Sequence, residues 1–199
     1  YGLSYTTFEQ KIVRMSPAYN ANLTKDTDLI EVSVEVKNTG DVAGKDAVQL
    51  YWKAPYTNGG IEKADHVLCA FDKTQMLEPG DSQIVHLTFH LQDVANYDFM
   101  DANKNNHVGY ELDAGDYAIT LNKNAPEVYD EVKYKINDET NYDTDRFTGY
   151  EVTNRFTERG FYSSMPGEDD IEFTQFSRKD MGHAKSEDIE SFPSHPTIE

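Results

Sequence analysis

Cysteine is almost absent from this chain, which has 199 residues and a single cysteine, Cys69. One cysteine excludes an intramolecular disulfide, so the sequence contains no evidence for an oxidising compartment. A chain of this length can bury a hydrophobic core without disulfides or structural metals. Cys69 lies in the apolar segment 67–71, and we interpret it as a small buried hydrophobic residue.

Positive charge and long apolar runs are also scarce. The chain has 18 Lys and Arg against 36 Asp and Glu, a formal net charge of -18. A field of this sign repels phosphate groups, so we expect neither nucleic acid nor a membrane surface as a partner. No apolar run approaches the roughly 20 residues that span a bilayer. The sequence starts at Tyr1, which we interpret as the start of an excised bacterial fragment, cytoplasmic or secreted, of unknown compartment.

Motifs for catalysis and for cofactor binding are missing. There is no Gly-x-Ser-x-Gly elbow and no glycine-rich phosphate loop. Asp101, Asn103 and Asn105 imitate the first ligands of a calcium loop. However, Asn106 occupies the position that needs glycine, and Leu112 occupies that of the bidentate glutamate. We therefore expect no cofactor and no metal.

The pattern that is present is that of a β-sheet protein. Apolar and polar residues alternate over 30–37, which places the apolar side chains on one face of a strand. We expect Gly40 and Gly44 to take positive φ in the turn that follows. The predicted strands are 8–15, 29–37, 47–53, 67–74, 83–90, 109–112, 117–121 and 131–136. Short strands at such spacing are typical of an all-β, two-sheet sandwich of immunoglobulin-like or fibronectin type III-like architecture.

Residues 38–45, Asn-Thr-Gly-Asp-Val-Ala-Gly-Lys, and 48–51, Val-Gln-Leu-Tyr, look like parts of a known domain. They resemble the fibronectin type III-like domain of glycoside hydrolase family 3, which is rich in β-glucosidases and β-xylosidases. Further segments match in the same order, and the resemblance covers about residues 1–137. These segments are 1–8, Pro55, 62–63, 70–74, 77–82 and 112–117. The resemblance also implies a short excursion at 91–96, which could form one helical turn.

The resemblance implies an accessory role. Such a domain would pack against a catalytic (β/α)₈ barrel and an α/β domain of the same polypeptide, and would stabilise them. The nucleophile of this family lies in a Ser-Asp-Trp motif, which this sequence does not contain. We therefore expect no catalytic residue here and no hydrolysis by the fragment alone. The parent protein would be a retaining β-glycosidase, similar to a β-glucosidase.

Aromatic and polar residues around position 55 are candidates for contact with a sugar or with another domain. They are Tyr51, Trp52, Tyr56, Asn58 and Glu62. One interpretation is a stacking platform for sugar rings. The alternation of β-strand side chains favours another, in which Trp52 points into the sandwich and Tyr51 points away from it. The loop 56–65 is the best candidate for reaching a neighbouring domain.

Residues 138–199 differ in composition from the rest of the chain. They contain 15 acidic and 6 basic side chains, a net of -9, with few aliphatic residues but nine aromatic ones. We interpret them as an extended arm whose aromatic rings dock on a neighbouring surface, and an unstructured linker is the alternative. Residues 176–180 loosely resemble the connection in relatives whose barrel follows the β-sandwich.

Two functions from other classes stay open beside the accessory role. A carbohydrate-binding module would use the aromatic residues near position 52 as its platform. A protein-interaction domain would use the acidic, aromatic arm as its ligand.

Overall fold

The computed structural model describes residues 4–18, 21–24, 27–154 and 177–178. The all-β class is confirmed, and each predicted strand is present with ends that differ by a few residues. Within the described residues the elements are β1 (Phe8–Ser16), β2 (Asn22–Leu23), β3 (Leu29–Asn38), β4 (Ala47–Lys53), β5 (Val67–Lys73), β6 (Ser82–His90), η1 (Leu91–Val94), β7 (Asn96–Asp98), β8 (Gly109–Leu112), β9 (Gly115–Asn124), β10 (Glu127–Ile136) and β11 (Thr140–Tyr142).

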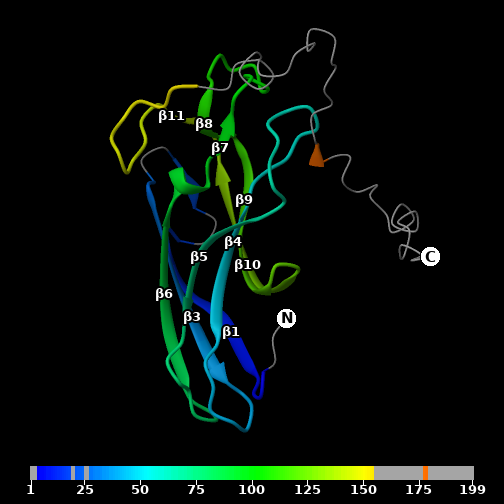
Figure 1. Cartoon of the computed structure of the whole chain (residues 1–199), viewed down its shortest axis with the longest axis vertical. Coiled ribbons are helices and arrows are strands. Elements are labelled where there is room, and N and C mark those ends of the chain that lie inside the picture. The colour runs from blue at the N-terminus through cyan, green and yellow to red at the C-terminus, as the bar shows by residue number, and fades with distance from the viewer. Residues whose placement is uncertain (1–3, 19–20, 25–26, 155–176, 179–199) are drawn as a thin grey trace, which may run out of the picture.

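Two sheets form the sandwich, as Figure 1 shows. One has the order β1-β3-β6, with antiparallel neighbours, and the other has the order β2-β10-β9-β4-β5. In the second sheet only the short β2 pairs in parallel, with β10. Strands β5 and β6 are therefore edge strands of different sheets.

The core lies between the two sheets because each inner face is apolar. Every second residue of β3 is buried, as the alternation over 30–37 predicted. Ile30 and Val34 from one sheet, and Leu50, Ile119 and Leu121 from the other, are 0% exposed. Burying a side chain of this size stabilises the fold by about 1.5–3 kcal/mol relative to leaving it in water.

The turn after β3 is held by the buried side chain of Asn38. Its Nδ2 donates to the carbonyl oxygens of Val42 and Leu77, both at 2.9 Å, and its Oδ1 accepts from the Thr6 hydroxyl at 2.8 Å. The expectation that Gly40 needs positive φ is wrong, as it is for Gly44. Gly40 is required for space, since a Cβ there would collide with Thr6.

A third, small sheet of order β11-β8-β7 lies at one end of the sandwich (Figure 1). The predicted helical turn is confirmed as η1, a 3₁₀ helix whose Leu91 and Val94 are buried. Strands β2, β7 and β11 were not predicted, because two or three residues are too few to show a period. No helix of the described residues is long and apolar enough to cross a membrane.

The first part of the predicted arm lies against the sandwich. β11 pairs with β8, and the ring of Tyr142 packs against the core. Shortly after β11 in the chain, the Arg146 guanidinium forms an ion pair with Asp93 of η1. Phe147 and Tyr150 are 75% and 77% exposed, so docking of these two rings on a neighbouring surface stays a prediction. The remaining aromatic residues of the arm, Phe156, Phe161, Tyr162, Phe173, Phe176 and Phe192, lie outside the described residues.

Candidate functional site

Trp52 belongs to the core, which corrects its place among the candidate contacts. The residue is 1% exposed, and its indole lies 4.8 Å from the Tyr117 ring and 6.0 Å from the Phe89 ring, between centroids. Its inward direction follows from its phase with Val48 and Leu50 on β4. A sugar ring therefore cannot stack on Trp52.

Tyr51 projects from the opposite face of β4. Its ring meets the His66 imidazole edge to face at 5.1 Å, and its hydroxyl donates to Gln49 Oε1 at 3.0 Å. The imidazole in turn contacts the Asp65 carboxylate at 2.9 Å. Tyr51 thus supports the end of the loop 54–66, which connects β4 to β5.

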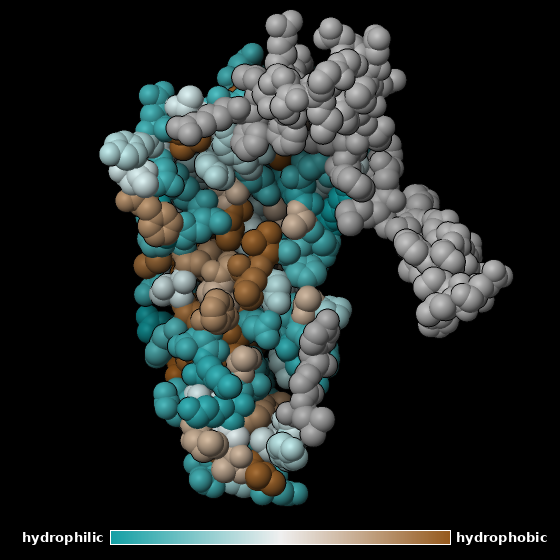
Figure 2. Space-filling model, viewed as in Figure 1, coloured by the Kyte–Doolittle hydropathy of each residue, from teal (hydrophilic) through white to brown (hydrophobic). Residues whose placement is uncertain are grey.

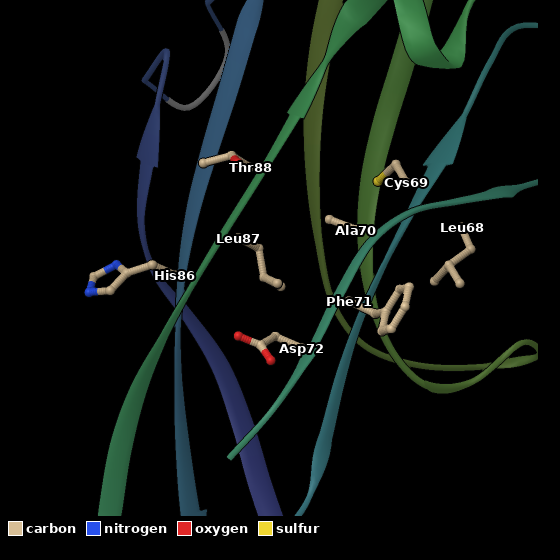
Figure 3. Close-up of a pocket in the computed structure, with 8 residues that line it drawn as sticks. All are labelled: Leu68, Cys69, Ala70, Phe71, Asp72, His86, Leu87 and Thr88. Carbon is tan, nitrogen blue, oxygen red and sulfur yellow. The ribbon is translucent and has the colours of Figure 1, made fainter. Parts of the chain in front are cut away.

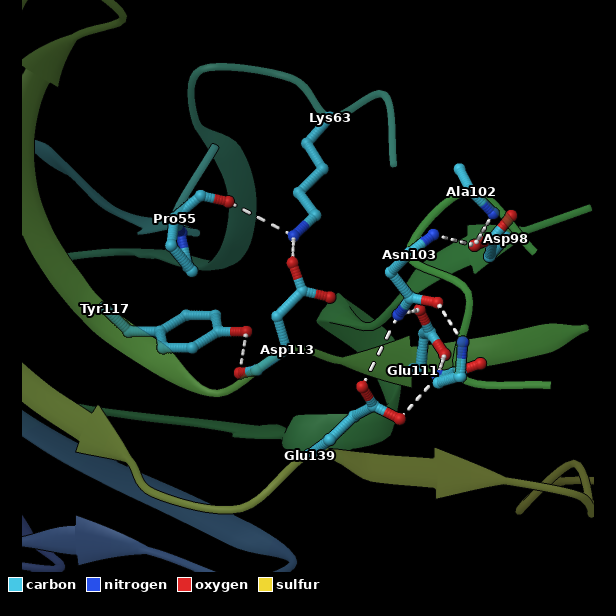
Figure 4. A network of polar contacts seen from close by, with 10 residues as sticks. Pro55, Lys63, Asp98, Ala102, Asn103, Glu111, Asp113, Tyr117 and Glu139 are labelled. Carbon is cyan, nitrogen blue, oxygen red and sulfur yellow. Dashed lines mark hydrogen bonds and ion pairs between the residues drawn. The ribbon is translucent and has the colours of Figure 1, made fainter. Parts of the chain in front are cut away.

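A buried lysine fixes this loop to the sandwich (Figure 4). The Lys63 side chain is 1% exposed, and its ammonium forms an ion pair with Asp113. The same ammonium donates to the Pro55 carbonyl at 3.1 Å. The backbone of Asp113 is held by Tyr117, whose hydroxyl donates to the Asp113 carbonyl oxygen at 2.9 Å. The loop is therefore attached to a residue of the core.

Tyr56 and Glu62 face each other across the loop and contact the arm. The Tyr56 hydroxyl donates to Glu62 Oε1 at 3.1 Å and lies 3.2 Å from the Ser177 hydroxyl. The backbone N–H of Arg178 donates to Glu62 Oε2 at 3.0 Å. This N–H lowers the pKa of Glu62. Asn58 lies in the exposed turn at the tip of the loop.

Asp65 completes the contact with the arm. The Arg178 guanidinium forms an ion pair with Asp65, and its carbon lies 4.8 Å from the centroid of the Tyr56 ring. The hydrogen bond with His66, and secondarily the charge of Arg178, lower the pKa of Asp65. The sequence predicted the loop 56–65 as a contact loop and named Tyr56 and Glu62 in it, but it did not single out Lys63, Asp65 or Arg178. Lys63 is an isolated lysine in a polar loop, so it belongs to no periodic pattern. The contact between Asp65 and Arg178 joins residues 113 positions apart, which no local pattern indicates.

A second polar cluster surrounds Glu111 on β8 (Figure 4). Glu111 is 0% exposed, and its carboxylate accepts from Asn103 Nδ2 at 2.5 Å and from Asn105 Nδ2 at 2.7 Å. Both amides also contact the Glu139 carboxylate. These are two of the residues that imitated a calcium loop, and their amide nitrogens donate to carboxylates. In the described part of the chain, no three His, Cys, Asp or Glu side chains are placed to hold a metal ion.

The edge strand β5 carries an exposed apolar surface, which we call the β5 strip. It consists of Val67, Leu68 and Phe71 on β5 and Met76 just after it, with exposed fractions from 39% to 72%. Figure 2 shows hydrophobic side chains gathered along the middle of the face on which β5 lies. A shallow hollow of about 400 Å³ separates β5 from β6, with Ala70 and Leu87 between the two strands (Figure 3).

The sequence and the fold of this chain are similar to those of known proteins. A family model described as the fibronectin type III-like domain matches residues 46–125. β-Glucosidase A of Butyrivibrio fibrisolvens is 38% identical over 128 residues, which cover 61% of this chain. The crystal structure of a β-glucosidase from Paenibacillus barengoltzii aligns with a TM-score of 0.60 and 32% identity over 70% of this chain. The chain contains the fibronectin type III-like domain of glycoside hydrolase family 3.

This fibronectin type III-like domain is a small part of its relatives. The chain covers 15% of the Butyrivibrio protein and 15% of the Paenibacillus structure. It covers 17% of a β-glucosidase from Thermotoga neapolitana, solved in complex with glucose, at 31% identity and a TM-score of 0.55. The family match includes both the loop 54–66 and the β5 strip.

Proposed function

We propose that this fibronectin type III-like domain is a non-catalytic accessory part of a larger, β-glucosidase-like glycoside hydrolase. Its role is to pack against the catalytic domains of the same polypeptide, a (β/α)₈ barrel and an α/β domain, and to stabilise them. The proposal agrees with relatives that are named β-glucosidases and that are several times longer than the matched segment.

The observation that carries the proposal is the β5 strip. Phe71 is 72% exposed and Leu68 is 45% exposed on the same edge strand, and Met76 just after the strand is 57% exposed. Apolar side chains that gather on a surface, rather than occurring singly, mark sites of interaction. An adjoining domain would remove them from water.

The size of such an interface fits a domain contact within one chain. Interfaces between domains bury on the order of 600–1,500 Å² and are more polar than permanent subunit interfaces. Because the partner is covalently linked, its effective concentration is on the order of millimolar, so a modest interface is sufficient. Asp72 and Lys73 beside the strip supply its polar rim.

The substitution Leu68→Asp in the complete parent enzyme tests this proposal. A carboxylate buried in the interface should destabilise the parent by about 1–3 kcal/mol, because it replaces apolar burial with an unpaired charge. Thermal unfolding of the parent would shift to lower temperature, while kcat/KM at 25 °C would stay close to that of the wild type.

Val128→Asp is the matched control. Val128 is a strand residue of similar exposure, 49%, but it lies on β10 away from the β5 strip. In the 199-residue chain alone, the two variants should unfold alike. Equal effects of the two substitutions on the parent would contradict the proposal, as would a parent that keeps its melting temperature without residues 1–137.

A further inference from the structure

We propose that Tyr56, Glu62 and Asp65 form an arginine socket that binds residues 177–178 and holds the arm on the end of the sandwich. The inference goes beyond the proposed function, because the occupant of this surface is a segment of the same chain rather than a catalytic domain. Figure 1 shows the short segment at 178 beside the loop between β4 and β5.

Each part of the socket recognises a different group of the segment. Glu62 accepts the backbone N–H of Arg178, and the Tyr56 hydroxyl meets that of Ser177. Asp65 pairs with the guanidinium, while the Tyr56 ring lies against it, 4.8 Å from centroid to guanidinium carbon. A planar guanidinium suits an ion pair and a ring at the same time, whereas a lysine ammonium is a compact, strongly hydrated charge.

The socket is organised from the sandwich side. Lys63, buried and paired with Asp113, fixes the middle of the loop. His66 contacts the Asp65 carboxylate at 2.9 Å, and the Tyr56 hydroxyl donates to Glu62. Side chains that are already held by neighbours lose less conformational freedom when they bind, which favours docking.

The sequence of the arm supplies a reason for an arginine at this point. Residues 138–199 contain 15 acidic but only 6 basic side chains, and the sandwich is also acidic. Because the arm and the sandwich are both negatively charged, they repel each other, so docking of the arm depends on its few basic residues. The two basic residues of the arm that the structure describes, Arg146 and Arg178, both pair with carboxylates of the sandwich.

NMR spectroscopy of the intact 199-residue chain tests the socket. In the wild type we expect a nuclear Overhauser effect between the Tyr56 ring protons and the Arg178 side chain, and slowed exchange of the amide at position 178. Asp65→Asn and Arg178→Gln should each speed this exchange by about two- to fivefold, the range for an exposed ion pair. Arg178→Lys should fall between these variants and the wild type.

Two matched controls separate the socket from a general charge effect. Lys179→Gln removes the same charge one residue later, and Asn58→Ala changes the exposed tip of the same loop. Both should leave the exchange rate at position 178 unchanged. The proposal is overturned if Lys179→Gln acts like Arg178→Gln, if Arg178→Lys equals the wild type, or if the wild type lacks the Tyr56–Arg178 signal.

Discussion

The indole ring of Trp52 and the phenol ring of Tyr117 lie tilted by 31° with their centroids 4.8 Å apart. This contact is the first link between the core and the surface loop. The Tyr117 hydroxyl donates to the Asp113 carbonyl, and the Asp113 carboxylate pairs with buried Lys63. A residue proposed as a surface contact is therefore the internal support of the loop that carries Tyr56.

Replacement of Trp52 measures this support. Trp52→Ala should lower the free energy of unfolding by about 3–5 kcal/mol, because it leaves a large cavity between the sheets. Trp52→Phe should cost less, since it keeps a ring and removes the indole N–H, which has no hydrogen-bond partner among the described residues. Urea unfolding followed by far-UV circular dichroism gives both values. A cost for Trp52→Ala below that of Tyr51→Ala would contradict the core assignment.

The Lys63–Asp113 pair should respond unequally to removal of its two partners. Asp113→Asn leaves the ammonium, on a side chain 1% exposed, without a carboxylate, and should destabilise the chain by about 3–5 kcal/mol. Lys63→Met should cost less, because the Asp113 side chain is 29% exposed and water can solvate it. Chemical unfolding of both variants and of the double variant checks this order. Equal costs would show that burial of the ammonium is not the dominant factor.

The sequence predicts the sheets well because period-two alternation is a local signal. It indicated the buried face of β3 and the inward direction of Trp52 without any knowledge of partners. It did not indicate Lys63, because a polar residue in a loop has no period. Nor could it indicate Arg178, whose partners lie more than 110 residues earlier in the chain. The roles of Lys63 and Arg178 depend on tertiary contacts between irregular segments, which have no signature in the local sequence.

Cys69 should react slowly in the folded chain. Burial raises the pKa of its thiol to about 12, and its Sγ donates to the Leu50 carbonyl at 3.2 Å. The thiolate is the reactive species, so alkylation by iodoacetamide at pH 8 should be much slower than in the urea-unfolded chain. Mass spectrometry of timed samples measures both rates. Similar rates would show that the strand β5 opens readily.

Acid should release the arm from the arginine socket. The pKa values of Glu62 and Asp65 are lowered from 4.5 and 3.8, chiefly by the Arg178 N–H for Glu62 and by His66 for Asp65. A lowered pKa means that docking is fully favoured above the ordinary values and is lost as the pH falls through the lowered ones. The Tyr56–Arg178 signal should therefore persist at pH 6 and fade below about pH 4. A signal unchanged at pH 2 would exclude the carboxylates as its basis. The groups that lower the pKa of Glu62 are Arg178, Ser177 and Tyr56, and those that lower the pKa of Asp65 are His66, Arg178 and Lys53.

Glu111 should make the fold less stable as the pH rises, the reverse of the pH dependence of Glu62 and Asp65. Removal from water is the main cause that raises its pKa above 4.5, and the charge of Glu139 adds to it, although the amide of Asn105 opposes both. The folded chain then holds this proton more tightly than the unfolded chain does. The contribution of Glu111 to stability is therefore complete below its ordinary pKa and is lost as the pH rises through the raised one.

Comparison with a variant isolates this contribution from the repulsion within a chain of net charge -18. The difference in free energy of unfolding between the wild type and Glu111→Gln should shift against the wild type as the pH rises from 4 towards 7. Glu35→Gln, on the exposed side of β3, gives the background slope for loss of one carboxylate. A Glu111→Gln difference that follows this background at every pH would show that the two asparagine amides fully compensate the buried charge.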